Sequence, residues 1–331
     1  MNALDSKTEQ EVVLRLEQLR KVFTIGSTKK KTVHVINGID LVIGSEEVVA
    51  LVGESGSGKT TVARLIARLY TPSSGKMILD SREVPRHLSR RRALEYRKTV
   101  QMIFQDPYAS LNSLQPIRYA IERPLKIHKM GGRSGIESRM KDLLEECGLK
   151  PAESFLRRYP HELSGGQMQR VGVARALAVK PKLILADEPT SMLDVSIRLD
   201  IMNLLLDLKE KEKVSFLFIT HDLAGARYVS DRVAIMYAGH ILEIGPSESV
   251  ISDPKHPYTQ LLKSAAPKPE SGLGPDRIEV GGEVPDLTAL PPGCPFEPRC
   301  PFARAECREK LPEMRRLSET HFVRCVLFPS T

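Results

Sequence analysis

Residues 53–60, Gly-Glu-Ser-Gly-Ser-Gly-Lys-Thr, carry the pattern G-x-x-x-x-G-K-[ST]. Glycines at these positions let backbone N–H groups turn inward around a phosphate, and the positive end of a helix expected at 59–69 faces the same group. Lys59 would then reach the β- and γ-phosphates, and the Thr60 hydroxyl would bind Mg²⁺. A chance glycine-rich turn is the alternative, but the apolar run at 47–53 supplies the strand that a phosphate-binding loop needs before it.

A pair of acidic residues follows a second apolar run, Leu-Ile-Leu-Ala at 183–186. Asp187 would stand at the carboxyl end of a buried strand, where a carboxylate can hold Mg²⁺ through water. Glu188, directly after it, can polarise the attacking water as a general base. Such a run is weak evidence alone, but downstream of a phosphate-binding loop it predicts a P-loop ATPase.

The sequence Leu-Ser-Gly-Gly-Gln at 163–167 is a candidate second phosphate cradle, because Ser164 and two glycines would form an anion-binding turn at a helix N-terminus. One nucleotide does not need two cradles on one chain. We therefore expect a head-to-tail dimer, in which the turn of each chain closes on the nucleotide of its partner. A simple helix N-cap at Ser164 is the alternative.

The elements that must position these residues alternate between strands and helices, which predicts an α/β fold with a mainly parallel core sheet. The expected strands are 12–23, 33–43, 47–53, 99–105, 182–187, 215–220 and a hairpin at 232–245 that turns at Ala238-Gly239. The expected helices are 59–69, one after Ser164, 196–211 and 256–265. The polar segment 106–160, with amphipathic stretches at 117–127 and 136–147, is expected to be a helical insertion.

The composition of the 331 residues, 41% hydrophobic and 27% charged, suits a folded domain. No apolar stretch approaches the roughly 18 residues of a membrane span, and residues 1–10 are polar, so we expect a chain kept on the cytoplasmic side. The net charge is +8. Two basic clusters, 29–31 and 90–92, are either solvated loops or lie near an anionic membrane surface. An aromatic-and-basic RNA-binding signature is missing.

Four of the five cysteines lie near the C-terminus, separated by five, six and seventeen residues. They are Cys294, Cys300, Cys307 and Cys325. In a reducing cytosol such a group favours a metal or cluster site over disulfides. Structural zinc sites favour closer pairs, whereas four thiolates suit a 4Fe–4S cluster. Zinc and free or oxidised thiols remain alternatives.

The segment around these cysteines holds 13 of the 23 prolines, counted from Pro254 onward, so we expect an irregular extension with little core. Metal ligation would then supply part of its folding energy. His321 is expected at the surface. Cys147, on a helical segment, is expected to be a small buried packing residue.

Further motifs make the chain resemble the ABC transporter ATPases. Residues 163–167 are similar to the signature sequence of that family, and Gln105, in FQDP at 104–107, is similar to its Q-loop glutamine. Residues 191–194 resemble the D-loop, with Met192 where alanine is commoner, and His221 resembles the switch histidine. Phe23 is placed like the aromatic residue that stacks on adenine, with a core strand residue as the alternative.

The resemblance implies ATP and Mg²⁺ as cofactors and assigns roles residue by residue. Catalytic roles fall on Lys59, Gln105, Glu188 and His221, and Mg²⁺ contacts on Thr60, Gln105 and Asp187. Nucleotide contacts fall on Phe23, Gly53, Glu54, Ser55, Gly56, Ser57, Gly58, Lys59, Thr60, Thr61, Ser164, Gly165, Gly166, Gln167 and Asp194.

Within that family the chain looks like the oligopeptide/dipeptide permease ATPases. The segments that carry this likeness are 104–112, 194–197, 221–239, 256–259 and 293–301, and 226–232 leans toward the F-type subunit. The likeness implies an ATPase domain at 11–265, with a parallel RecA-like core, an antiparallel β-subdomain and a helical subdomain at about 106–178. It also implies a C-terminal region at 266–331, where some relatives hold a 4Fe–4S cluster on four cysteines.

The same likeness implies a set of partners: a second, different ABC ATPase in a heterodimer, two transmembrane permease subunits, and an extracellular or periplasmic peptide-binding protein. It places the chain peripherally on the cytoplasmic face of the membrane, without nucleic acid. Sugar or nickel remains open as cargo, because the ATPase does not touch cargo. The rival class is a soluble ABC ATPase acting on nucleic acid or ribosomes, but one ATPase domain without a long heptad stretch argues against it.

Overall fold

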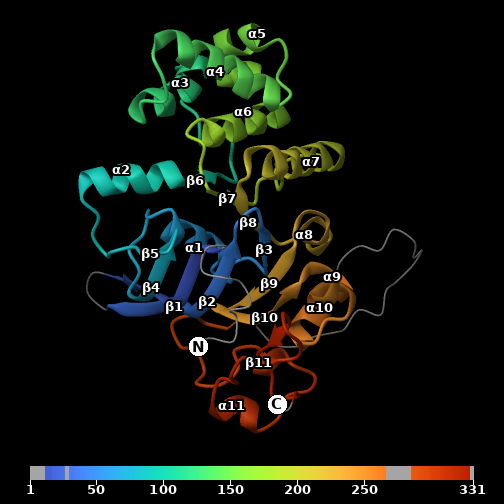
Figure 1. The fold of residues 1–331 in the computed structure, drawn as a ribbon. Coiled ribbons are helices and arrows are strands. Elements are labelled where there is room, and N and C mark those ends of the chain that lie inside the picture. Colours follow the sequence, from blue (N-terminus) through green and yellow to red (C-terminus); the bar gives the residue numbers. More distant parts are fainter. Residues whose placement is uncertain (1–11, 27–29, 266–284, 329–331) are drawn as a thin grey trace. The chain divides into compact units, whose positions relative to one another are not determined.

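The computed structural model describes residues 12–26, 30–265 and 285–328. Residue 11 at the expected domain start, Lys29 of the first basic cluster, and the parts of the C-terminal region at 266–284 and 329–331 lie outside the described residues. The chain divides into two compact units, one made of residues 1–44, 48–86 and 220–331 and the other of 45–47 and 87–219 (Figure 1). Among the described helices, none has the length and apolar character to cross a membrane.

The first unit contains an antiparallel sheet in the order β2-β1-β4-β5. Its strands are β1 (Val12–Ile25), β2 (Lys31–Gly44), β4 (Ser74–Leu79) and β5 (Arg82–Glu83). Strands β1 and β2 pair along their whole length, and both extend beyond the strands expected at 12–23 and 33–43. Leu14, Leu16 and Leu19 of β1 are fully buried, so burial of this apolar face holds the sheet against the unit's core.

A second set of strands in this unit follows the order β11-β12-β10-β9-β3. The strands are β3 (Val48–Val52), β9 (Arg232–Tyr237), β10 (His240–Pro246), β11 (Arg315–Arg316) and β12 (Phe322–Val323). The helices of this unit are α1 (Lys59–Ile66), α8 (Leu223–Val229), α9 (Ser247–Ser252), α10 (Pro257–Ala265) and α11 (Glu306–Glu309). Strand β3 runs parallel to β9.

The hairpin expected at 232–245 is confirmed, since β9 and β10 pair antiparallel. Ala238 and Gly239 both have positive φ, 44° and 79°, which is the conformation that two-residue hairpin turns favour. The extension after Pro254 is less irregular than expected, because its strand β12 pairs with β10.

The second unit carries three parallel strands in the order β8-β7-β6. They are β6 (Val100–Ile103), β7 (Leu183–Asp187) and β8 (Ser215–Thr220). The helices are α2 (Arg90–Thr99), α3 (Ile117–Ile127), α4 (Arg133–Glu146), α5 (Ala152–Arg157), α6 (Gly165–Leu177) and α7 (Val195–Glu212). The α/β fold with parallel and antiparallel sheets is therefore confirmed, as are the helices expected near 117–127 and 136–147.

The basic cluster at 90–92 does not form a loop but the first turn of α2, which Ser89 caps by accepting a hydrogen bond from the Arg92 N–H. The three arginine side chains are exposed, so the loop expectation is wrong, whereas the two expected environments, solvent and an anionic membrane surface, stay open. Cys147 is fully buried at the end of α4, which confirms its expected packing role.

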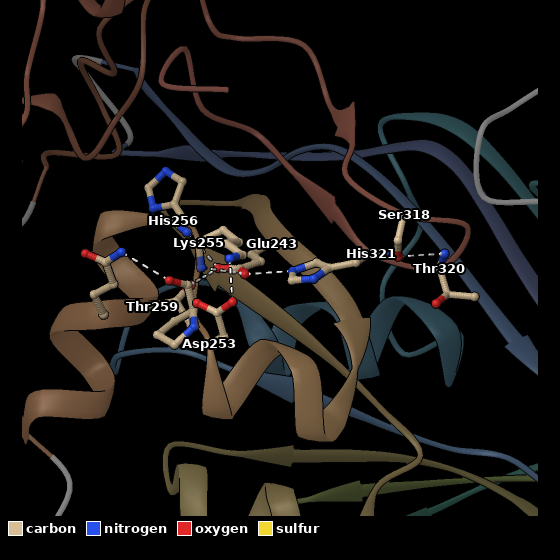
Figure 2. A network of polar contacts seen from close by, with 10 residues as sticks. Glu243, Asp253, Lys255, His256, Thr259, Ser318, Thr320 and His321 are labelled. Carbon is tan, nitrogen blue, oxygen red and sulfur yellow. Dashed lines mark hydrogen bonds and ion pairs between the residues drawn. The ribbon is translucent and has the colours of Figure 1, made fainter. Parts of the chain in front are cut away.

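A buried carboxylate, Glu243 of β10, ties the C-terminal segments to the rest of the first unit (Figure 2). Glu243 has no exposed surface and accepts hydrogen bonds from the N–H groups of Lys255 and His256, each at 2.9 Å, and from Thr259 Oγ1 at 2.6 Å. Nε2 of His321 lies 2.8 Å from Glu243 Oε1. The expectation that His321 is a surface residue is wrong, because its ring is drawn into this network and is only 6% exposed.

We predict that Glu243→Ala lowers the free energy of unfolding by about 3 kcal/mol, because it leaves several buried donors without an acceptor. The matched control is Glu248→Ala, since Glu248 pairs with Arg227 at 2.7 Å but is 67% exposed. Its loss should lower the stability far less, because water screens an exposed ion pair. Urea denaturation of both variants measures the difference, and equal effects would contradict a structural role for the buried network.

Candidate active site

The glycine-rich loop at 53–58 begins where the fully buried strand β3 ends and finishes at the start of α1. Gly58, at the helix N-cap, has φ 106°, which only glycine adopts readily. A Cβ on Gly53 would lie 2.1 Å from the Met236 carbonyl oxygen, so only a glycine fits there. The Gly239 N–H donates to the Ser57 carbonyl at 2.9 Å, which braces the loop against the β9–β10 hairpin.

Lys59 is 5% exposed, and its ammonium lies inside the loop. It donates to the carbonyls of Gly53 at 2.7 Å and Glu54 at 2.9 Å. Burial next to backbone carbonyls keeps the ammonium at the loop, where the sequence predicts the β- and γ-phosphates. The half-buried Thr60 follows in the first turn of α1.

The second unit brings Gln105 and Glu188 together. Strands β6 and β7 are parallel neighbours, so the residues that follow them meet at the same edge. Nε2 of Gln105 donates to Glu188 Oε2 at 3.1 Å. Asp187, the last residue of β7, is only 3% exposed.

Glu188 itself is held in an unusual backbone conformation, with φ 45°. Its N–H donates to the Ile219 carbonyl at 2.9 Å, and its own carbonyl accepts from the Ser191 hydroxyl at 3.0 Å. Left-handed backbone at a residue other than glycine is costly and tends to occur where the side chain must be aimed. These bonds fix the direction of the half-buried carboxylate.

The turn at 163–167 begins α6 with a capping box. The Gln167 N–H donates to Ser164 Oγ at 3.3 Å, and the Ser164 N–H donates to Gln167 Oε1 at 3.1 Å. A Cβ on Gly166 would lie 2.7 Å from Cγ2 of Ile197, so this glycine lets α6 pack closely on α7. The N-cap role of Ser164 is thus present in the structure, while the phosphate cradle stays a prediction.

Three further candidates lie on other elements. His221 is exposed just after β8, and Asp194 is exposed at the N-terminal end of α7. Phe23 is half-buried on β1, where its ring meets Tyr70 edge-on at 5.3 Å and the Lys21 ammonium lies 4.7 Å from its centroid.

Sequence reasoning missed the residues that contact Glu54 from the C-terminal segments. The Glu54 N–H donates to Tyr258 Oη at 2.9 Å, and the Glu54 carboxylate accepts two bonds from Arg299. The family segment 256–259 contains Tyr258, but nothing in the sequence pattern indicates that its hydroxyl reaches the loop. Arg299 lies 245 residues from Glu54 in the chain.

The four C-terminal cysteines line one small cavity. Three of them are buried, Cys300 is half-buried, and all are free thiols. Burial raises the pKa of Cys294 to about 12, and it also raises the pKa of Cys300 and of Cys325. Over the described ranges, no three or more His, Cys, Asp or Glu side chains are grouped closely enough to hold a metal ion. The four thiols thus share one cavity, but among the described residues they do not form a ligand group, so the structure does not support the expected 4Fe–4S cluster.

Two family models match the chain. The model described as "ABC transporter" matches residues 36–191, and "Oligopeptide/dipeptide transporter, C-terminal region" matches residues 242–307. The oligopeptide transport ATP-binding protein AppF of Bacillus subtilis (strain 168) is 40% identical over 325 residues, which cover 96% of this chain and 98% of AppF. The putative oligopeptide transport ATP-binding protein YkfD of the same organism is 42% identical over 319 residues, 96% and 95% of the two chains.

Among solved structures, the dimeric post-hydrolysis state of the ATP-binding cassette MJ0796 bound to ADP and Pi is similar, with a TM-score of 0.63 and 30% sequence identity. The match covers 71% of this chain and 98% of that one. This chain belongs to the ABC transporter family, as an ATP-binding protein of the kind found in oligopeptide transporters. ATP is its substrate and ATP hydrolysis its activity.

We propose that Glu188 is the general base, on the strength of its aimed carboxylate and its contact with Gln105. Glu188→Gln should retain ATP binding but lower the turnover number by about 10²–10⁴-fold, the usual cost of losing a general base. Steady-state ATPase assays and equilibrium ATP binding on the same preparation check this. Turnover close to that of the unmodified chain would remove Glu188 from this role.

Proposed function

We propose that ATP hydrolysis by this chain powers a membrane importer for oligopeptides or dipeptides. The observation that carries the proposal is the likeness to oligopeptide transport ATP-binding proteins along almost the whole chain, including the C-terminal region at 242–307. The division into an ATPase domain at 11–265, with a helical subdomain at about 106–178, and a C-terminal region at 266–331 is part of this proposal. So is a peripheral place on the cytoplasmic face of the membrane.

The proposed site roles are those that the family resemblance implies, and the geometry of the loop and of the strand ends described above is compatible with them. In this proposal the loop at 53–61 binds the ATP phosphates, with Lys59 on the β- and γ-phosphates. Thr60, Gln105 and Asp187 hold Mg²⁺, and His221 senses the γ-phosphate. Phe23 stacks on adenine, and its contacts with Tyr70 and Lys21 leave part of the ring exposed for this.

The chain is proposed to act in a head-to-tail dimer with a second, different ABC ATPase, whose nucleotide is closed by the turn at 163–167 and by Asp194. Apolar side chains exposed near this turn support a contact surface there. Met192, Val195 and Leu199 are 57%, 74% and 45% exposed. Apolar side chains that are exposed together in this way favour a protein interface. Leu193, their neighbour, lies 3.4 Å from the position of a Gly165 Cβ, which places this surface beside the turn.

Two transmembrane permease subunits complete the proposed complex, together with a peptide-binding protein outside the membrane. Exposed large apolar side chains follow Gln105 along the segment where the permease would dock. They are Tyr108, Leu114 and Tyr119, which are 57%, 82% and 43% exposed. Large apolar side chains exposed on this segment support a protein contact there.

The importer proposal is tested by co-purifying the chain with its transporter partners and reconstituting the complex in lipid vesicles. We expect peptide-loaded binding protein to stimulate ATP hydrolysis and peptide to enter the vesicles, and the Glu188→Gln complex to do neither. Stimulation by nickel- or sugar-loaded protein in place of peptide would overturn the cargo. Stimulation of the isolated chain by nucleic acid or ribosomes would overturn the transport role and favour the soluble class.

A further part of the proposal is that Cys294, Cys300, Cys307 and Cys325 hold a 4Fe–4S cluster with a structural role in the extension. Their position on one cavity supports it. A bound cluster would supply the thiolate–iron bonds that cross-link this segment. The raised thiol pKa values mean that ligation must displace protons, so loading should improve as pH rises.

We predict that anaerobically purified protein is brown and contains iron and sulfide, and that Cys294→Ser loses both and makes the extension sensitive to protease. Cys147→Ser is the matched control, because Cys147 is equally buried but lies in the second unit. It should retain the colour. Colourless protein with stoichiometric zinc would show a structural zinc site instead of the cluster. Colourless protein without metal and with four titratable thiols would show that the cysteines hold no metal.

A further inference from the structure

Glu54, the second residue of the phosphate-binding loop, is held through all of its polar groups. Its N–H donates to Tyr258 Oη at 2.9 Å, and its carbonyl accepts from the Lys59 ammonium at 2.9 Å and from the Ser57 N–H at 3.3 Å. Its carboxylate accepts from Arg299. Glu54 therefore connects the loop lysine to residues that come from the C-terminal segments of the chain.

The pair between Glu54 and Arg299 has the geometry of a strong charge-assisted contact. Nη1 of Arg299 donates to Oε2 at 2.9 Å and Nη2 donates to Oε1 at 3.1 Å, so the pair is bidentate. The Arg299 side chain is 13% exposed and that of Glu54 29% exposed, which limits screening by water. The bond to Glu54 accordingly raises the pKa of Arg299 above its usual range.

Arg299 is itself positioned by aromatic residues. Nη1 also donates to Tyr237 Oη at 3.2 Å, and the guanidinium carbon lies 5.8 Å from the Tyr237 ring centroid and 5.7 Å from that of Phe296. Tyr237, Tyr258 and Phe296 are all buried and contact one another, with centroids 4.6 to 5.4 Å apart. The guanidinium is thus fixed before it meets Glu54, so little side-chain entropy is lost on pairing.

We propose that Arg299 of the C-terminal extension is a positioning residue for ATP binding, which holds Glu54 and through its carbonyl the Lys59 ammonium. This inference rests on the proposed role of the loop at 53–61 in binding phosphate. It links the extension to the loop, because Arg299 ends the short turn Glu297–Arg299 of the extension and donates to the Glu54 carboxylate. The pair between Arg308 and Glu297 does not contact the loop. Its two side chains lie 2.7 Å apart within the extension, and Arg308 is 75% exposed.

The test is the equilibrium Kd for ATP of the full-length chain and its variants, together with KM and kcat of ATP hydrolysis. Arg299→Ala should raise the Kd and the KM about tenfold, since a charged hydrogen-bonded partner of the loop is lost. The kcat should change less, because Arg299 does not touch the reacting atoms. Arg299→Lys should be intermediate, as an ammonium keeps the charge but not the bidentate pair.

Controls separate this role from a general effect on folding. Arg308→Ala removes an exposed arginine pair of the same extension and should bind ATP like the unmodified chain. Glu54→Gln should weaken ATP binding, and adding Arg299→Ala to it should cost little more, because the two residues act through one contact. If Arg299→Ala does not fold, Arg299→Lys and Glu54→Gln still decide the question.

Several outcomes would overturn the inference: an unchanged Kd in Arg299→Ala, a lowered Tm without a change in Kd, or additive effects of the two substitutions. Lys59→Ala distinguishes this failure from failure of the loop assignment. If Lys59→Ala loses ATP binding while Arg299→Ala keeps it, only the role of Arg299 is wrong. If Lys59→Ala still binds ATP, the phosphate-binding role of the loop is wrong as well.

Discussion

A loop that binds phosphate through backbone N–H groups must hold a strained backbone in one shape, and the loop at 53–60 can do so only because rigid neighbours brace it. Gly53 packs so closely against the Met236 carbonyl that no side chain fits between them. The Ser57 carbonyl is tied to Gly239 in the tight turn between β9 and β10. The hairpin at 232–245 therefore fixes, together with the glycines, where the loop at 53–60 runs.

In the second unit, the side chains of the candidate site are held in place by the ends of parallel strands and by backbone hydrogen bonds. Parallel strands end at one edge of a sheet, so Gln105 after β6 and Glu188 after β7 come within hydrogen-bond distance. The left-handed backbone of Glu188 stores strain that its bonds to Ile219 and Ser191 hold in place. A carboxylate aimed in this way can orient water for attack on a phosphate without first reorganising.

Two polar contacts with different consequences tie the C-terminal extension to the rest of the first unit. The buried Glu243 carboxylate contacts both Thr259 of α10 and His321 (Figure 2). One side chain therefore holds two segments that are distant in the sequence. Arg299 instead reaches the loop residue Glu54. The first contact stabilises the extension, and the second extends its influence to nucleotide binding. In a family whose ATPases share one catalytic core, such an appendage can adjust ATP affinity without altering the catalytic residues.

The sequence alone determined the motifs whose geometry depends on neighbouring residues: the loop at 53–60, the Asp187-Glu188 strand end, the turn before α6, and the alternation of strands and helices. Local spacing suffices there, because a glycine-rich turn between strand and helix has few possible shapes. Only the tertiary structure decided that His321 is buried, that β12 joins β10, and that Arg299 meets Glu54. Those outcomes depend on contacts between residues far apart in the chain, and no local pattern encodes which distant charge a buried carboxylate will meet.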